Sequence, residues 1–262
     1  MRRYLVLFRQ YVSTSFIREM EFRSGFFVLM LSELVADVIS IVFFTILYGS
    51  VASIRGWSYP EALLLLGTFM FLTYLSHGLF YRNFARVSEY VNEGRLDILL
   101  TKPVDPQFAM TLRYTAVSDI LNIVPSLIVI IYAISRLDLT ITAGSLIGYL
   151  SLIAIGMAII YSLWFAISIL AFWLTQVEEI QELWNGLFDF TRYPRQIYEG
   201  SIRALFTFVV PILTIVAFPT EFFLGRISGS AILYNLLLAA GLLAVTRMLW
   251  QVGLRRYSSA SS

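Results

Sequence analysis

The sequence predicts an all-α integral membrane protein with six transmembrane helices, and its apolar pattern and composition are the main reasons. Six apolar stretches cover residues 26–48, 59–80, 115–135, 144–174, 204–224 and 230–250. Each is long enough to cross a bilayer, which takes roughly 20 apolar residues in a helix. Hydrophobic residues make up 58% of the 262 residues and charged residues only 14%, which is more apolar than a soluble domain of this length needs.

The basic residues lie mostly on one side of these predicted spans. If the N-terminus is inside, the inner segments carry 16 lysines and arginines, and the outer loops carry only Arg55, Arg136 and Arg226. The positive-inside rule then places both termini in the cytoplasm. Because the outer loops are too short to hold a folded domain, we expect residues 1–257 to form one transmembrane domain. Residues 258–262 are expected to be a disordered tail.

The beginnings of the first two spans carry local signals. Residues 1–24 are expected to include an amphipathic helix, since apolar and aromatic side chains share one side and arginines mostly occupy the other. Such a helix suits the headgroup plane, and the alternative is a plain cytoplasmic start to the first span. Ser58 can cap the second span, and Pro60 lies in its first turn.

The inner loop 82–113 is the most polar long segment between predicted spans. Residues 86–91 can continue as a helix, Gly94 can end it, and residues 96–100 predict a second short helix. Two prolines then break the helix before the third span. A short amphipathic element held between two spans suits contact with a partner protein.

The region after the fourth apolar stretch allows two interpretations. The stretch 144–174 is too long for one perpendicular helix and is expected to tilt or to protrude. In the first interpretation, residues 176–203 form a cytoplasmic helix and turn, because their charges are costly in lipid, and 204–224 is the fifth span. In the second, 180–198 is a polar fifth span and 206–224 a re-entrant hairpin on the outer side. The count of arginines favours the first interpretation.

Several kinds of site are missing from the sequence. The chain has no cysteine and one histidine, which excludes disulfides and disfavours a zinc site. No G-x-x-x-x-G-K-[ST] phosphate loop occurs, so the chain is expected neither to bind ATP itself nor to be an enzyme. The net charge of +2 gives no reason to expect nucleic acid as a partner. No cofactor or metal ion is expected.

The most informative motif lies in the inner loop, where residues 93–104 read EGRLDILLTKPV. This segment resembles the G-x-L-D-x-L-L-x-[KR]-P signature that follows the second helix of type-2 ATP-binding-cassette permeases, especially bacterial permeases of this length with no attached ATPase. Weaker similarities are the run RYP at 192–194 followed by IY at 197–198, and the proline-bearing run 206–219 before the last helix. With the basic amphipathic start, the resemblance covers nearly the whole chain.

The resemblance implies a half-transporter in the bacterial cytoplasmic (inner) membrane. Two permeases, identical or different, would form an exporter with separate ATPase subunits that bind the ATP. ATP-driven closure of the ATPases would push on a coupling element in loop 82–113. The residues that the resemblance assigns to this coupling are Arg86, Glu89, Glu93, Gly94, Arg95, Asp97 and Lys102. Their mixed charges suit a protein–protein contact, and a solvated loop against lipid headgroups is the alternative.

Ionisable and polar side chains inside the predicted spans form a second group of candidates. Glu33 and Asp37 are four residues apart and share one helix face. Each costs roughly 2.5 kcal/mol or more at the bilayer centre, so they should face protein or water. His77 lies near the inner end of the second predicted span, and Asp119 and Asn122 lie near that of the third.

Two roles for these side chains remain open. They can line a substrate cavity or gate. They can also form an internal network in which Glu33 or Asp119 pairs with Arg82 or Arg113, because charges inside membranes often pair to be satisfied.

The sequence leaves the function open between different classes. The leading hypothesis is the permease subunit of an ATP-driven exporter. One alternative is an ion-coupled secondary transporter that uses Glu33, Asp37 and His77 directly, and another is a membrane-embedded enzyme or structural protein. The sequence does not name the substrate, although a largely apolar interior leans toward lipids, drugs or amphipathic molecules.

Overall fold

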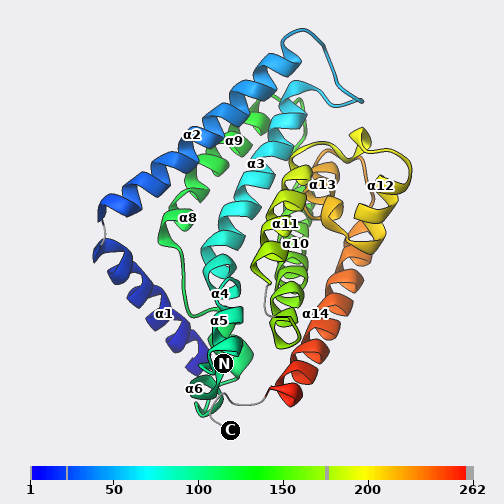
Figure 1. Ribbon diagram of the computed structural model, residues 1–262. Coiled ribbons are helices and arrows are strands. Elements are labelled where there is room, and N and C mark those ends of the chain that lie inside the picture. Colours follow the sequence, from blue (N-terminus) through cyan, green and yellow to red (C-terminus); the bar gives the residue numbers. More distant parts are fainter. Residues whose placement is uncertain (1, 22, 175–176, 258–262) are drawn as a thin grey trace.

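The structure is a computed structural model that describes residues 2–21, 23–174 and 177–257 (Figure 1). These ranges are helical apart from loops and one isolated β-bridge between Ile54 and Trp57. The all-α fold class predicted from the sequence is therefore confirmed. The predicted disordered tail, 258–262, lies outside the described residues.

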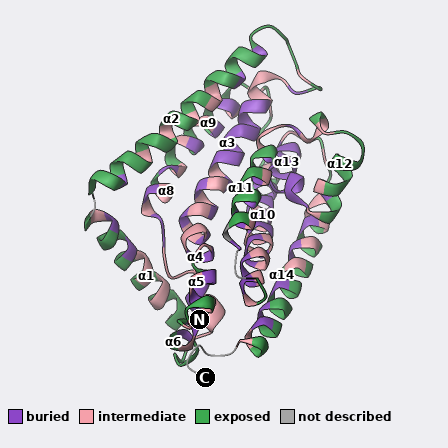
Figure 2. Ribbon diagram, in the orientation of Figure 1, coloured by how far each residue is buried: buried purple, intermediate pink, exposed green. Residues whose placement is uncertain are grey.

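Two helices at the N-terminus form an angled arm beside the bundle. Helix α1 (Arg2–Glu21) runs away from the N-terminus, and α2 (Arg23–Tyr48) then turns toward the opposite end of the molecule (Figure 1). Most apolar side chains of α2 are exposed (Figure 2), and only Phe26, Phe44 and Tyr48 are buried in the bundle. Such an apolar outer face suits lipid or another membrane helix.

The core lies between longer helices that pack side by side. Helix α3 (Tyr59–Ser76) packs against α9 (Ile123–Ser135), and α10 (Ala143–Ile169) packs against both α13 (Ile212–Phe223) and α14 (Ser230–Arg256). Figure 2 shows α3 and α13 as mostly buried and α14 as exposed on its outer side. Small residues permit close approach, since a Cβ at Gly148 or Gly253 would collide with a neighbouring phenylalanine ring.

Helix α3 begins where the sequence predicts it. The backbone N–H of Ser58 donates to the Glu61 carboxylate at 2.8 Å, and Pro60 occupies the first turn. The helix does not stop at residue 80, because it continues through a π-helical turn, η1 (His77–Tyr81), to Asn92.

The segment that follows has both predicted short helices and one more. Helix α4 (Arg82–Phe84) is followed by α5 (Val87–Asn92), which ends two residues before Gly94. The φ of Gly94 is +70°, which is favourable for glycine, and α6 then covers Leu96–Leu100. The sequence predicted no helix at α7 (Pro106–Thr111). It forms because Pro106 starts a helix well and Asp105 caps it, accepting the Phe108 N–H at 3.1 Å.

In the described ranges, five helices are long and apolar enough to cross a membrane. The third is formed jointly by α8 (Val117–Leu121) and α9, and the fourth extends from α10 into η2 (Leu170–Phe172). The five are Arg23–Tyr48, Tyr59–Asn92, Val117–Ser135, Ala143–Phe172 and Ser230–Arg256.

The predicted fifth span, 204–224, is not one straight helix. It consists of α12 (Gly200–Ala204) with η5 (Leu205–Val209), followed by α13, and the two parts meet at 88°. The break lies at Pro211, which has no N–H to continue a helix. Helix α13 itself is almost entirely buried in protein, which suits irregular backbone at membrane depth.

The contacts on both sides of this bent pair place its two ends together. Before it, Glu199 pairs with Arg55, and the Gln196 side chain accepts the Trp57 indole N–H at 3.0 Å. After it, Arg226 donates to the Glu61 carboxylate at 2.6 Å. Both ends therefore lie beside loop 49–58, which is the geometry of a re-entrant hairpin.

The geometry of this region agrees with the second interpretation, in which 206–224 is a re-entrant hairpin, better than with the first. Helix α11 (Glu178–Phe188) packs against α10 and η3 (Asp189–Arg192) and buries Trp184. The chain then reaches loop 49–58 through η4 (Arg195–Ile197). The arginine count had favoured the first interpretation. It did not take into account that these polar side chains face a cavity and carboxylates rather than lipid, as described below.

Helix α1 begins and α14 ends at the other end of the molecule (Figure 1). The Tyr4 hydroxyl accepts the backbone N–H of Asp105 at 3.4 Å, and Arg247 on α14 pairs with the Asp105 carboxylate at 2.8 Å. We call this the terminal end, and the end with loop 49–58 the loop end.

Candidate functional site

A polar cavity of about 500 Å³ lies between α2, α3, α10, α11 and η3. It brings together Glu33, Asp37 and His77, three of the five side chains predicted as a cavity or gate. Asp37 is at the middle of α2, and His77 is near the middle of the continuous helix Tyr59–Asn92. The cavity is therefore far from both ends of these helices.

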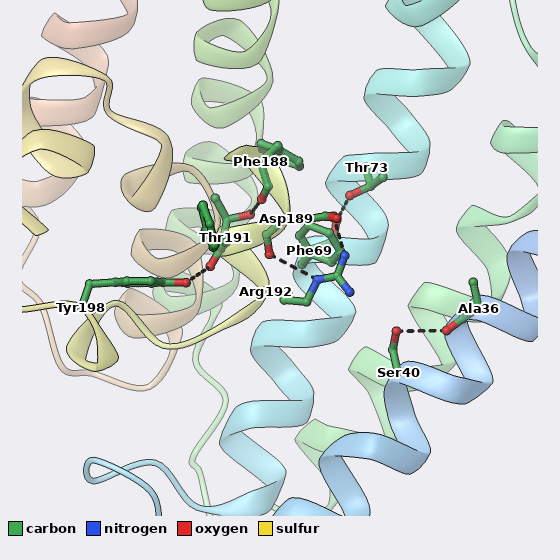
Figure 3. Close-up of polar contacts among 10 residues, drawn as sticks. Ala36, Ser40, Phe69, Thr73, Phe188, Asp189, Thr191, Arg192 and Tyr198 are labelled. Carbon is green, nitrogen blue, oxygen red and sulfur yellow. Dashed lines mark hydrogen bonds and ion pairs between the residues drawn. The ribbon is translucent and has the colours of Figure 1, made fainter. Parts of the chain in front are cut away.

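Several side chains of α2 that can form hydrogen bonds line one side of the cavity. Asp37 accepts a hydrogen bond from the Tyr74 hydroxyl of α3 at 2.7 Å. Glu33 and Ser40 also line the cavity, and the Ser40 hydroxyl donates to the Ala36 carbonyl at 3.0 Å (Figure 3). Glu33 forms no ion pair among the described residues, so this carboxylate faces the cavity without a fixed cation.

The opposite wall is formed by the segment after α11. Arg192 pairs with Asp189, and its guanidinium carbon lies 5.0 Å from the ring centroid of Phe69 on α3 (Figure 3). Sequence reasoning missed this pair as part of the cavity, because it placed the segment in the cytoplasm. The high density of charged residues in this segment was an available signal, because charges inside a membrane are costly unless the side chains face water or protein.

His77 lies between the cavity and a cluster of aromatic side chains. Its ring stacks on Tyr81 at 5.1 Å and lies 5.6 Å from Trp164, centroid to centroid. It belongs to η1, and π-helical turns often occur at functional positions. The turn leaves the Gly78 carbonyl free to accept the Ala116 N–H at 2.8 Å, which ties the start of α8 to this site.

The lining of the cavity is acidic and aromatic. Its described residues include four carboxylates and one guanidinium group, together with Trp164, Trp184 and Phe69. Carboxylates stabilise cations and hydrogen-bond donors, and aromatic faces attract cations as well. Among the described residues, no group of histidine, aspartate and glutamate side chains is arranged to hold a metal ion.

Asp119 and Asn122 do not line this cavity. Asp119 on α8 lies within electrostatic range of Arg82, Glu33 and Glu19. Asn122, at the junction of α8 and α9, is only 1% exposed. Of the five residues predicted to form a cavity or gate, three therefore line the cavity and two lie outside its lining.

The ion-pair network suggested by the sequence forms with different partners. Arg82 pairs with Glu19 of α1, and neither Glu33 nor Asp119 forms an ion pair with an arginine in the described residues. The guanidinium group of Arg113 donates to the Tyr90 hydroxyl at 3.3 Å instead. Glu19 was missed because its partner is distant in the sequence.

The predicted coupling residues all lie at the terminal end, on α5, α6 and the turns beside them. Arg95 pairs with both Glu89 and Glu93, which fixes the turn at Gly94. Arg86 lies before α5, Asp97 is in the first turn of α6, and Lys102 is exposed.

Helix α6 also presents apolar side chains to its surroundings. Ile98 is 62% exposed and Leu100 is 40% exposed, while Leu96 and Leu99 are buried against the bundle. We call the segment 86–102 the coupling segment, with its exposed face centred on Ile98.

The fold and the cavity define a multi-pass membrane protein with a polar chamber in its helical bundle, which is the architecture of a membrane transport protein. The sequence model described as "ABC-2 family transporter protein" matches residues 34–261. The chain therefore belongs to the ABC-2 transporter family, and the resemblance drawn from the inner loop is confirmed. No curated protein and no solved structure matches the chain.

Proposed function

We propose that this chain is the permease subunit of an ATP-driven exporter that works with separate ATPase subunits and a second permease. Membership of the ABC-2 family makes it a membrane permease of an ABC transporter. The observation that carries the finer proposal is the coupling segment, where charged residues surround an exposed Ile98 at the terminal end. An exposed apolar side chain ringed by charges is the usual composition of a docking surface.

The proposed orientation places the terminal end in the cytoplasm of a bacterium, in the inner membrane. The coupling segment and both termini then face the compartment that contains ATP. The exposed apolar face of α2 is proposed to contact lipid or the second permease. ATP would be bound by the partner subunits, since the chain has no phosphate loop of its own.

The coupling proposal can be tested with two matched isoleucines. Ile98 is 62% exposed at the terminal end, and Ile141 is 56% exposed in the loop before α10 at the other end. Ile98→Glu should abolish co-purification of an ATPase with the tagged permease, and Ile141→Glu should leave it intact. Equal retention of the ATPase by both variants would place the docking surface elsewhere.

We propose that the cavity is part of the substrate path, which requires that water reaches it. The chain has no cysteine, so a single introduced cysteine is labelled without background. Ser40→Cys faces the cavity, whereas Ile39→Cys is on the exposed outer face of α2. A charged, water-soluble thiol reagent should modify Ser40→Cys and not Ile39→Cys. If Ser40→Cys does not react in the resting protein or during ATP turnover, the cavity is not a solvated path.

The ion-coupled alternative has weaker support than ATP-driven transport. The family match points to ATP as the energy source, and the His77 ring is packed against Tyr81 and Trp164. A transport assay in vesicles separates the two hypotheses. ATP-driven transport should stop when ATP is removed and should persist when an ionophore collapses the ion gradients.

A further inference from the structure

Three arginine side chains gather around the ring of Tyr114 at the terminal end. The guanidinium carbon of Arg86 lies 4.2 Å from the ring centroid, and those of Arg18 and Arg113 lie 5.1 and 5.5 Å from it. Arg18 comes from α1, Arg86 from the turn before α5, and Arg113 from the connector that leads to α8. We call these three residues the basic triad.

No carboxylate in the described part of the chain forms an ion pair with the basic triad. By contrast, Arg82 and Arg95 nearby are both paired. The shared ring keeps the three guanidinium carbons within about 11 Å of one another, close to the Debye length of ~10 Å in 0.1 M salt. Their repulsion is only partly screened, so an anion bound among them would be strongly favoured.

The centre of the triad is held rigidly by buried hydrogen bonds. The Asn83 side chain is fully buried, donates to the Tyr114 carbonyl at 2.7 Å and accepts the Tyr114 N–H at 2.8 Å. The next N–H, of Thr115, donates to the Ser15 hydroxyl of α1 at 3.1 Å. The three cations are therefore arranged around a fixed point, and an anion would not have to order it.

An apolar groove adjoins the triad. Arg18 also lines a groove of about 280 Å³ where α1 meets α2, and Phe26 and Leu29 form the apolar part of its wall. Glu19 lies in the same groove, but its carboxylate is already bound by Arg82 and by backbone N–H groups. We call this space the elbow groove. It places an apolar surface directly beside Arg18, one of the three arginines of the basic triad.

We propose that the basic triad and the elbow groove together bind one anionic phospholipid. The phosphate group would lie among the guanidinium groups, which bind phosphate through charge-assisted hydrogen bonds. The upper part of an acyl chain would lie against Phe26 and Leu29. The apolar groove is what favours a lipid over free phosphate, and basic pockets between membrane helices are suited to such headgroups. The proposal depends on this geometry and not on the ATPase partner.

The test uses the purified full-length chain in neutral detergent, titrated with phosphatidylglycerol and, separately, with phosphatidylcholine. Bound lipid is measured by native mass spectrometry and by the shift in the thermal unfolding midpoint. Phosphatidylglycerol should bind and raise the midpoint, and phosphatidylcholine should not. The exposed single variant Arg18→Gln should weaken phosphatidylglycerol binding about fivefold, and the triple variant with Arg86→Gln and Arg113→Gln at least about tenfold.

Controls separate this site from general attraction to a basic surface. A charge-matched triple variant changes exposed arginines outside the triad to glutamine, at Arg2, Arg9 and Arg255. It should bind phosphatidylglycerol as the wild type does, and an equal loss in this variant would overturn the proposal. Since Arg18 is exposed, Arg18→Gln keeps the test valid even if the triad triple variant does not fold.

Two further measurements identify the ligand. Leu29→Gln should weaken phosphatidylglycerol binding, because it makes the elbow groove polar. Glycerol phosphate, which has the headgroup chemistry without chains, should not displace the lipid at equal concentration. Displacement by glycerol phosphate would show a free-phosphate site and overturn the lipid assignment. Loss of a co-purified ATPase in Arg18→Gln with unchanged lipid binding would instead show that the triad binds a protein.

Discussion

Glu19 is expected to be the side chain that fastens α1 to the membrane bundle. Its carboxylate pairs with Arg82 and accepts the N–H groups of Val117 and Ser118 at 3.1 and 3.2 Å. It therefore acts as the N-terminal cap of α8 although it belongs to a helix nearly 100 residues earlier. The change Glu19→Ala removes all these contacts at once.

The magnitude follows from burial. The Glu19 side chain is 8% exposed, so its removal leaves two backbone N–H groups and a guanidinium group without a partner. Breaking a buried ion pair by removing one partner costs about 3–5 kcal/mol. The Arg82 side chain is 35% exposed and can recover some hydration, so the lower value of about 3 kcal/mol is expected. For a chain of this size, that lowers the unfolding midpoint by about 6–12 °C.

The assay is thermal unfolding in detergent, followed by the fluorescence of the five tryptophans. The matched control is Glu21→Ala, which removes an exposed carboxylate from the same helix and should change the midpoint by no more than about 2 °C. Hydrogen exchange should also become faster at Val117 and Ser118 in Glu19→Ala only. If the two variants unfold at the same temperature, Glu19 does not cap α8 as described.

Three further outcomes are expected. Glu221→Leu leaves the half-buried Arg195 without its buried partner and should cost about 3 kcal/mol in thermal unfolding. Adding Arg195→Leu should restore part of this loss, and no recovery would contradict a direct pair. Single cysteines at Glu199 and Lys102 should be labelled from opposite sides of sealed cells, and labelling from one side would refute the re-entrant hairpin. Gly94→Val forces a β-branched residue to φ +70° and should cost about 1–2 kcal/mol, with weaker ATPase co-purification than wild type.

The helices were predictable where one physical effect dominates. Apolar runs identified the helices that begin near residues 23, 59, 117, 143 and 230, because lipid requires long apolar helices. The short helix α6 was predictable because Gly94 and the apolar spacing of 96–100 are local signals. The cavity was predictable in part, since Glu33 and Asp37 had to face something other than lipid.

What could not be predicted depends on contacts between distant segments. Arg195 looked like a residue of an inner loop until the structure showed Glu221 accepting its Nε–H at 2.8 Å, with Glu221 only 1% exposed. Asn83 gave no sequence signal, because its role is to bind the backbone of Tyr114, 31 residues later. Such pairs are specified by tertiary geometry, and local patterns do not contain it.

The re-entrant hairpin is compatible with the orientation proposed from arginine counts, although those counts had argued against it. Even if Arg192, Arg195 and Arg203 are all moved to the loop end, 13 of the 19 basic residues remain on the terminal side and six on the other. The bias that sets the overall orientation is therefore retained. The position of the local segment is decided instead by specific partners, since Arg195 pairs with Glu221 and Arg192 with Asp189 beside the cavity. A basic residue with a buried carboxylate partner can lie at the loop end without reversing the membrane topology.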